Sequence, residues 1–124
     1  MILTDTSVWI NHLRDGNKHL EELLLNGKVM THVHIIGELA CGNIKNRKEI
    51  LSLMRALPLA PLIEFNEYLF FTDEHKLNGK GIGFVDIHLL ASAKLAQVRL
   101  WTTDKRLISA ASSLGISYEK NKIH

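Results

Sequence analysis

The chain has 124 residues, of which 46% are hydrophobic and 23% are charged, with a formal net charge of +2; one globular domain over residues 1–124 is expected. No apolar run reaches the roughly 18 residues of a membrane span, and the N-terminus does not show the basic and then apolar pattern of a signal peptide, so we expect no membrane partner. The single cysteine, Cys41, excludes an internal disulfide, which fits the cytoplasmic location that we expect. The small net charge permits a nucleic-acid partner but does not argue for one.

The first third of the chain alternates between short apolar runs and amphipathic segments. Residues 2–5 are predicted to form a short buried strand. Helices are predicted over residues 7–14 and 19–26, because a strong Asp-Gly-Asn turn signal separates two segments of helical spacing. A second strand is predicted over residues 29–33, and a helix over residues 34–43, whose apolar side chains fall on one face.

The middle of the chain is predicted to be mostly helical. A helix over residues 48–57 ends before Pro58, since the residue before a proline disfavours helical geometry. A short strand is predicted over residues 62–65 and a helix over residues 66–76. The stretch NGKGIG is interpreted as a loop, and residues 84–97, rich in Ala and Leu, as a strong helix.

The remaining segments predict a strand over residues 99–102, a helix over residues 104–114 and a last strand over residues 116–119. Strands that alternate with helices of about 10 to 14 residues require crossover connections, and these give a mainly parallel sheet covered on both faces. The predicted fold class is therefore α/β, a small α/β/α sandwich. In such sheets, ligands bind beyond the carboxyl ends of the strands.

Two aspartates stand at that edge. Asp5 follows the first predicted strand and precedes a helix, and Asp104 occupies the same setting late in the chain. Each acid alone is explained by helix capping, because an Asp at this position accepts hydrogen bonds from free N–H groups. Together they have a second explanation, since the carboxyl ends of parallel strands lie on one edge and bring the two acids toward each other.

Two further acids lie in apolar helical surroundings. Asp86 falls near the start of the most apolar helix, where a first-turn Asp also suits the helix dipole. Glu38 lies among small and apolar residues and has no basic residue four positions away; it is either a solvated residue or part of a site. If all four acids converge, at least one carboxyl pKa must rise unless a hard divalent cation neutralises them. Such a site suits metal-assisted hydrolysis of phosphodiesters.

The segments DTSVWI, GELACG, VDIHLLASA and TTDKRL, in this order, resemble the signature of PIN-domain ribonucleases, and more narrowly that of VapC toxins of bacterial toxin–antitoxin pairs. The resemblance implies a PIN-like fold and a Mg²⁺- or Mn²⁺-dependent endoribonuclease. It assigns catalytic roles to Asp5, Glu38, Asp86 and Asp104, with Asp5, Asp86 and Asp104 as metal ligands.

The resemblance also implies auxiliary positions and partners. A hydroxyl beside the first acid matches Thr6 or Ser7, and a hydroxyl before the last acid falls within Thr102 and Thr103. Relatives often carry an acid where this chain has Arg106; we interpret Lys105 and Arg106 as candidate phosphate contacts instead. The implied partners are an RNA substrate, a cognate VapB-type antitoxin that blocks the acidic pocket, and a second copy of the chain in a homodimer.

Three alternatives stay open on the sequence. A PIN-like interaction module that binds protein or RNA without cutting would be expected to have lost at least one of the four acids. A phosphatase with Asp5 as acceptor would need a second Asp at position 7, which is Ser7. A receiver domain would need an acidic doublet and a suitable late lysine.

Several other features are interpreted as structural. His32 and His34 would share one face of a strand, with no third metal ligand evident. The Gly-x-Gly-x-Gly stretch ending at Gly83 is expected to be a rim loop leading to Asp86, and Cys41 a small buried residue. The remaining features are two tryptophans expected in the core or at a dimer contact and a basic cluster that either contacts phosphates or is solvated: Trp9, Trp101, Lys45, Arg47 and Lys48.

Overall fold

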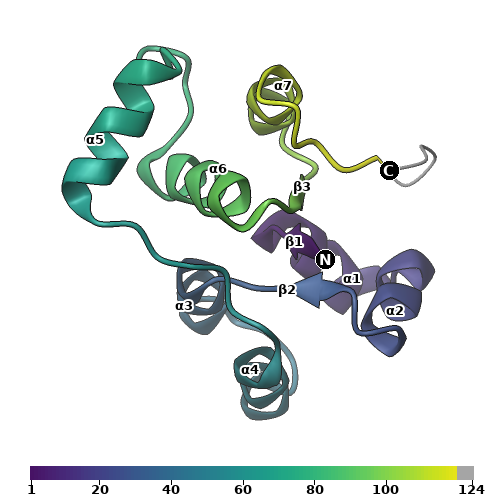
Figure 1. Ribbon diagram of the computed structural model, residues 1–124. Helices are drawn as coiled ribbons and strands as arrows, with labels where there is room; N and C mark the ends of the chain where they lie inside the picture. The colour runs from purple at the N-terminus through teal and green to yellow at the C-terminus, as the bar shows by residue number, and fades with distance from the viewer. Residues whose placement is uncertain (120–124) are drawn as a thin grey trace.

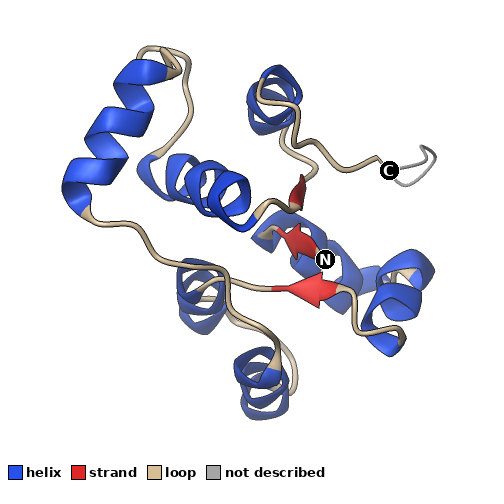
Figure 2. Ribbon diagram, in the orientation of Figure 1, coloured by secondary structure: helices blue, strands red, loops and turns tan. Residues whose placement is uncertain are grey.

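The computed structural model describes residues 1–119. In this part of the chain, three short strands form a parallel sheet at the centre of the molecule: β1 (Ile2–Thr4), β2 (Val29–Met30) and β3 (Arg99–Trp101). Their order is β2-β1-β3, so the first strand lies in the middle (Figure 2). This confirms the predicted α/β class with a parallel sheet.

Helices surround the sheet, and α5 lies at the outer edge beside α6 (Figure 1). Most of their bounds lie within two residues of the predicted ones. The helices of the described residues are α1 (Thr6–Asp15), α2 (Lys18–Leu25), α3 (Val33–Cys41), α4 (Arg47–Ala56), α5 (Phe65–Glu74), α6 (Phe84–Ala96) and α7 (Lys105–Ser113).

The core lies between β1 and α6. Leu3 in β1 is fully buried, and α6 is buried continuously from Ile87 to Ala93. A helix that is apolar on nearly all sides must lie inside the protein, because no face of it gains from contact with water. Trp9 is buried in the core as predicted, whereas Trp101 is half-buried.

The strand predicted over residues 62–65 is wrong. The chain makes a single parallel bridge earlier, between Thr31 and Leu59: Ala60 N–H donates to the Thr31 carbonyl at 2.7 Å, and Thr31 N–H donates to the Pro58 carbonyl at 2.9 Å. Pro61 has no N–H to extend the ladder, so the pairing stops and the chain runs extended into α5.

Three smaller expectations are also corrected. The last predicted strand, residues 116–119, is reduced to one bridge between Leu100 and Ser117. Cys41, expected to be buried, is exposed as the last residue of α3. His32 and His34 do not share a strand face, because β2 ends at Met30 and His32 caps the helix that contains His34.

His32 joins α3 to α6. Its Nδ1 accepts a hydrogen bond from the His34 N–H at 3.0 Å, and its Nε2 lies 3.2 Å from Ser92 Oγ. Since Nδ1 is an acceptor, the neutral ring carries its hydrogen on Nε2 and donates it to Ser92. Burial, followed by repulsion from His34 and His88, lowers the pKa of His32 to about 4, which keeps the ring neutral.

No helix within residues 1–119 combines the length and the apolar character that crossing a membrane requires.

We expect His32→Ala to lower the free energy of unfolding by about 3 kcal/mol, because it removes a helix cap and a buried hydrogen bond and leaves a cavity. His32→Asn keeps a capping acceptor and should lose less. Val33→Ala, at the neighbouring exposed position, should change stability by less than about 0.5 kcal/mol. Urea unfolding followed by circular dichroism measures all three; equal stability of His32→Ala and Val33→Ala would contradict the assigned role.

Candidate active site

Asp5 stands where β1 ends and α1 begins. Although it is the N-cap residue of α1, its side chain makes no capping hydrogen bond. Its Oδ2 instead accepts hydrogen bonds from Ser7 Oγ at 2.9 Å and from Thr102 Oγ1 at 2.7 Å, and only 6% of the residue is exposed. The carboxylate is therefore held by tertiary contacts, and the capping explanation of this acid is wrong for its side chain.

The same hydroxyls tie the ends of β1 and β3 together. Ser7 Oγ accepts the Thr103 N–H at 3.1 Å, and Thr102 Oγ1 accepts the Asp104 N–H at 3.1 Å. Each hydroxyl thus donates its one hydrogen to Asp5 and accepts a backbone N–H from the segment that follows β3. This network fixes where Asp5 and Asp104 lie relative to each other.

Thr102 is a functional candidate that the sequence left unresolved. The hydroxyl before the last acid was narrowed only to Thr102 or Thr103, and it is Thr102 that contacts Asp5 and is buried, whereas Thr103 is exposed and contributes its backbone N–H. The sequence does indicate that only one of the two hydroxyls can face Asp5, because neighbouring side chains of an extended segment point to opposite faces of the sheet. The side of the sheet that Asp5 occupies was not known from the sequence.

Asp104 does act as a helix cap. Its Oδ1 accepts the Leu107 N–H at 3.0 Å at the start of α7. In the described residues its Oδ2 accepts no hydrogen bond from protein. The cap and the site explanations of this residue are therefore compatible, since one oxygen orients the carboxylate and the other is left for a ligand.

Glu38 reaches the site from α3. Its Oε1 accepts a hydrogen bond from Thr6 Oγ1 at 2.7 Å, and Thr6 directly follows Asp5. The Glu38 side chain is exposed, as a solvated residue would be, yet its hydrogen bond aims it at the N-terminus of α1. Two of the four acids are thus placed by hydroxyl groups of one tetrapeptide, residues 4–7.

Asp86 lies near the other three acids. It lies in the first turn of α6, and its pKa is raised to about 6, first by burial and then by repulsion from Asp5, Asp104 and Glu38 in that order. A carboxyl group feels three other carboxylates only when all of them lie near it. The four predicted acids therefore share one region at the carboxyl ends of β1 and β3.

This acidic cluster, defined as Asp5, Glu38, Asp86 and Asp104, has no basic partner in the described part of the chain. Among residues 1–119, no Lys, Arg or His nitrogen lies within 4.0 Å of any of its carboxylate oxygens. Lys105 and Arg106 follow Asp104 in the first turn of α7, and both are exposed. The cluster is thus held together by hydroxyl groups and backbone N–H groups, which orient carboxylates without neutralising them.

The donor set fits a hard divalent cation. It offers only carboxylate and hydroxyl oxygens, which are the ligands that Mg²⁺ and Mn²⁺ prefer. Within residues 1–119, no three acidic, histidine or cysteine side chains are close enough to bind one ion together. That spacing still suits Mg²⁺, because this ion usually takes one or two carboxylates directly and keeps several of its waters.

Three imidazoles, those of His32, His34 and His88, pack against one another. The His34 ring stacks on His32, with ring centroids 4.8 Å apart, and meets His88 edge to face at 5.3 Å. Tyr68 stacks on the His88 ring at 4.9 Å. Burial, followed by repulsion from His34, lowers the pKa of His88. These rings pack against one another and against Tyr68 as aromatic groups.

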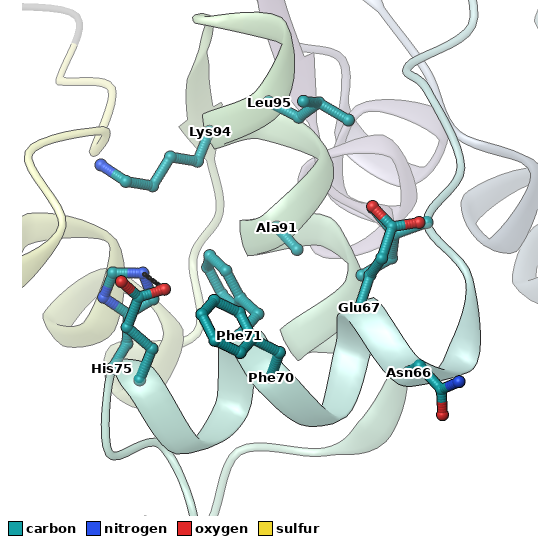
Figure 3. A pocket seen from close by; sticks show the side chains of 10 residues that line it. Asn66, Glu67, Phe70, Phe71, His75, Ala91, Lys94 and Leu95 are labelled. Atoms are coloured by element: carbon teal, nitrogen blue, oxygen red, sulfur yellow. Dashed lines mark ion pairs between the residues drawn. The ribbon is translucent and has the colours of Figure 1, made fainter.

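A separate apolar groove of about 500 Å³ lies between α5 and α6. Phe70 and Phe71 of α5 lie beside Ala91 and Leu95 of α6 in this groove (Figure 3). Phe70 is 68% exposed, and α5 has no buried residue. The groove contains none of the four site acids and is not the candidate active site.

Comparison with known proteins points to one family. The family model described as PIN domain matches residues 2–112. Ribonuclease VapC32 from two strains of Mycobacterium tuberculosis is 43% identical over 118 residues, which cover 94% of this chain and 95% of the relative.

Two solved structures share the fold. The structure of PAE2754 from Pyrobaculum aerophilum matches with a TM-score of 0.61 at 14% identity. The match covers 91% of this chain and 90% of the PAE2754 chain. FitAcB from Neisseria gonorrhoeae also has a TM-score of 0.61, at 22% identity, and covers 90% of this chain and 94% of that one. At these identities the two structures support the fold and nothing more.

We expect Asp86→Asn to raise the melting temperature at about pH 7.5 in the presence of a chelator. The folded-state pKa of Asp86, about 6, lies above the ordinary value of 3.8, so the ionised carboxyl opposes folding. The gain should shrink as the pH falls from about 6 toward 4, because wild-type Asp86 then becomes protonated in the folded state.

The matched control is Asp73→Asn on the exposed surface of α5, which should leave the melting temperature unchanged at both pH values. Differential scanning calorimetry of the three proteins makes the comparison. A gain for Asp86→Asn that does not depend on pH would show that the acidic cluster does not repel Asp86.

Proposed function

This chain belongs to the PIN-domain family, with VapC ribonucleases as its relatives, and we propose that it is a metal-dependent endoribonuclease that acts as the toxin of a toxin–antitoxin pair. The observation that carries the proposal is the acidic cluster: four carboxylates in one region without a basic partner in the described residues. Such a cluster is costly for a domain that only binds, and it is what metal-assisted hydrolysis of phosphodiesters requires.

In this proposal, Asp5, Asp86 and Asp104 hold a Mg²⁺ or Mn²⁺ ion, one or two of them through direct bonds and the rest through water molecules of the ion. When bound, a divalent cation lowers the pKa of a coordinated water and offsets negative charge on the phosphate. The protein's part is to hold the ligands still. Ser7 and Thr102 fix Asp5, while the N-terminal backbone of α7 fixes Asp104.

Glu38 is the fourth catalytic acid of the proposal. The Thr6 hydroxyl orients its carboxylate, leaving Oε2 free of protein donors within residues 1–119. An exposed carboxylate beside the cluster is suited to hold a water molecule and accept its proton. Lys105 and Arg106 are proposed to contact the RNA phosphates. Thr6, Ser7 and Thr103 complete the auxiliary set, since Thr6 donates to Glu38, Ser7 donates to Asp5, and the Thr103 N–H donates to Ser7.

The alternatives have less support. An inactive interaction module has no need for the acidic cluster, and all four acids are present and gathered. An aspartyl-phosphate mechanism with Asp5 as acceptor is disfavoured, because Asp5 Oδ2 already accepts two short hydrogen bonds and position 7 supplies a hydroxyl in place of a second acid. The nuclease explains each contact described at Asp5.

We also propose a cognate VapB-type antitoxin and a homodimer. The exposed apolar side chains of α5 and of the connection before it support a protein partner, because contiguous apolar surface of this kind usually marks an interface. Leu62, Phe65 and Phe70 are between 59% and 68% exposed. Light scattering of the purified chain, alone and with its antitoxin, distinguishes the two kinds of contact.

We expect Asp5→Asn and Asp86→Asn to lower the rate of cleavage of a single-stranded RNA by at least about 100-fold, because each removes a charge that the cation and the transition state require. The wild-type rate should fall to background in EDTA and return with Mn²⁺ or Mg²⁺. A gel-based assay with end-labelled RNA measures these rates.

The control for this experiment is Asp73→Asn, which makes the same chemical change on the exposed face of α5 and should cleave at the wild-type rate. Thermal melts establish that each variant is folded. Undiminished cleavage by a folded Asp5→Asn protein, or cleavage unaffected by EDTA, would refute the proposed site.

Expression of the wild-type chain without an antitoxin should arrest bacterial growth, and expression of Asp5→Asn to the same level should not, because arrest then depends on cleavage of RNA. Co-expression of the short protein encoded next to this gene should restore growth. Growth curves with immunoblots for expression level provide the measurement; normal growth with abundant wild-type protein would contradict the toxin role.

A further inference from the structure

A cavity of about 180 Å³ lies between the loop over residues 76–83 and α7, separate from the acidic cluster. Its floor is made of apolar side chains of the loop and of α7, while its polar lining consists of His75, Lys80, Arg106, Ser109 and Ser113. We propose that this cavity binds a backbone phosphate of the RNA, next to the phosphate that is cut. The proposal rests on the ribonuclease function proposed above.

The lining residues carry positive charge without compensation. No acidic residue lines the cavity, and in the described part of the chain neither Lys80 nor Arg106 has a carboxylate within 4.0 Å. His75 has only a long contact, 3.9 Å, to the exposed Glu74. Two permanent cations that face one small cavity favour an anion there, and the RNA backbone is the anion that the proposed reaction brings.

The chain keeps Arg106 against the loop. Its Nη1 donates a long hydrogen bond, 3.5 Å, to the carbonyl of Gly81, and most of its N–H donors have no other acceptor within residues 1–119. A Cβ atom at position 81 would lie 2.9 Å from Arg106 Cζ, so the guanidinium, which is the far end of a flexible and exposed side chain, would have to shift aside. Gly81 also has φ of +74°, a conformation that glycine adopts without strain. The glycine therefore makes room for the guanidinium.

Size and position select the ligand. A cavity of 180 Å³ is smaller than the roughly 300–1,000 Å³ of sites that enclose whole small molecules, so it suits a phosphate group with part of a ribose. Both of its walls lead to the acidic cluster, because Arg106 is two residues from Asp104 and the loop runs through Gly83 into the helix turn that contains Asp86. A phosphate held here would set the register of the strand across the cluster.

The first test measures RNA binding without cleavage. Fluorescence anisotropy with a labelled single-stranded RNA compares Asp5→Asn protein alone with the same protein carrying Lys80→Gln or Arg106→Gln. We expect each added substitution to raise Kd about tenfold, and the slope of log K against log salt to fall by about 0.7, the value for one lost contact to a single strand. Lys18→Gln on α2 is the matched control and should change neither.

The second test uses cleavage by the otherwise wild-type protein. Lys80→Gln should raise KM about tenfold with kcat nearly unchanged, because an interaction made equally in the ground state and the transition state affects only binding. Gly81→Ala should act in the same direction, because its Cβ displaces Arg106, and Gly81→Ala combined with Arg106→Gln should be no worse than Arg106→Gln alone.

The source of the phosphate is decided with inorganic phosphate as a competitor. Competitive inhibition of cleavage that Lys80→Gln abolishes, together with the change in RNA affinity, supports the RNA site. Binding of inorganic phosphate that depends on Lys80, with unchanged RNA affinity and KM, would overturn it in favour of a free-anion site. Unchanged Kd and KM in folded Lys80→Gln and Arg106→Gln would also overturn it, even if cleavage depends on Asp5. If the Lys80→Gln and Arg106→Gln variants lose RNA affinity but the wild-type protein cleaves no RNA, the nuclease proposal is overturned and the cavity remains an RNA-binding site.

Discussion

Two hydroxyl groups from distant parts of the chain donate to one carboxylate oxygen, Asp5 Oδ2, and the site depends on this shared acceptor. Ser7 belongs to the start of α1 and Thr102 directly follows β3, so the two bonds join the segments that follow two adjacent parallel strands. Hydroxyl groups orient a carboxylate without the neutralisation that an Arg or Lys would bring. The fold thereby keeps its central acid ordered without pairing it with a basic side chain, as a cation ligand requires.

The retained charge has a cost that is visible at Asp86. Burial in the first turn of α6 and the nearness of three other carboxylates raise its pKa to about 6. The apolar surroundings that bury α6 are the same ones that make this carboxyl sensitive to its neighbours, since charges interact more strongly where water is excluded. Stability of the free protein and readiness to accept a cation are therefore opposed at one residue, as expected at a site built for a ligand.

Charge is separated across the carboxyl edge of the sheet. Carboxylates occupy the ends of β1 and β3, while Lys80 and Arg106 line the cavity between the loop over residues 76–83 and α7, and no acid lines that cavity. A polyanion that crosses this edge meets cations beside the point where a metal would offset its charge. The close approach of Arg106 to Gly81 links the two regions, because the loop that holds the guanidinium also leads to Asp86.

The sequence by itself determined the alternation of strands and helices, the parallel sheet, and the candidacy of all four acids, because periodicity, turn residues and ordered motifs are local properties. It misjudged residues 62–65 and Cys41, where the outcome depends on which chain segment lies opposite. The roles of the site acids remain predictions, but their gathering, the choice of Thr102 over Thr103 as the partner of Asp5, and the cavity under Arg106 were decided only by tertiary structure. Each of these requires residues about 20 to 100 positions apart to lie close together, and such contacts are set by how the sheet and helices pack, which no local pattern encodes.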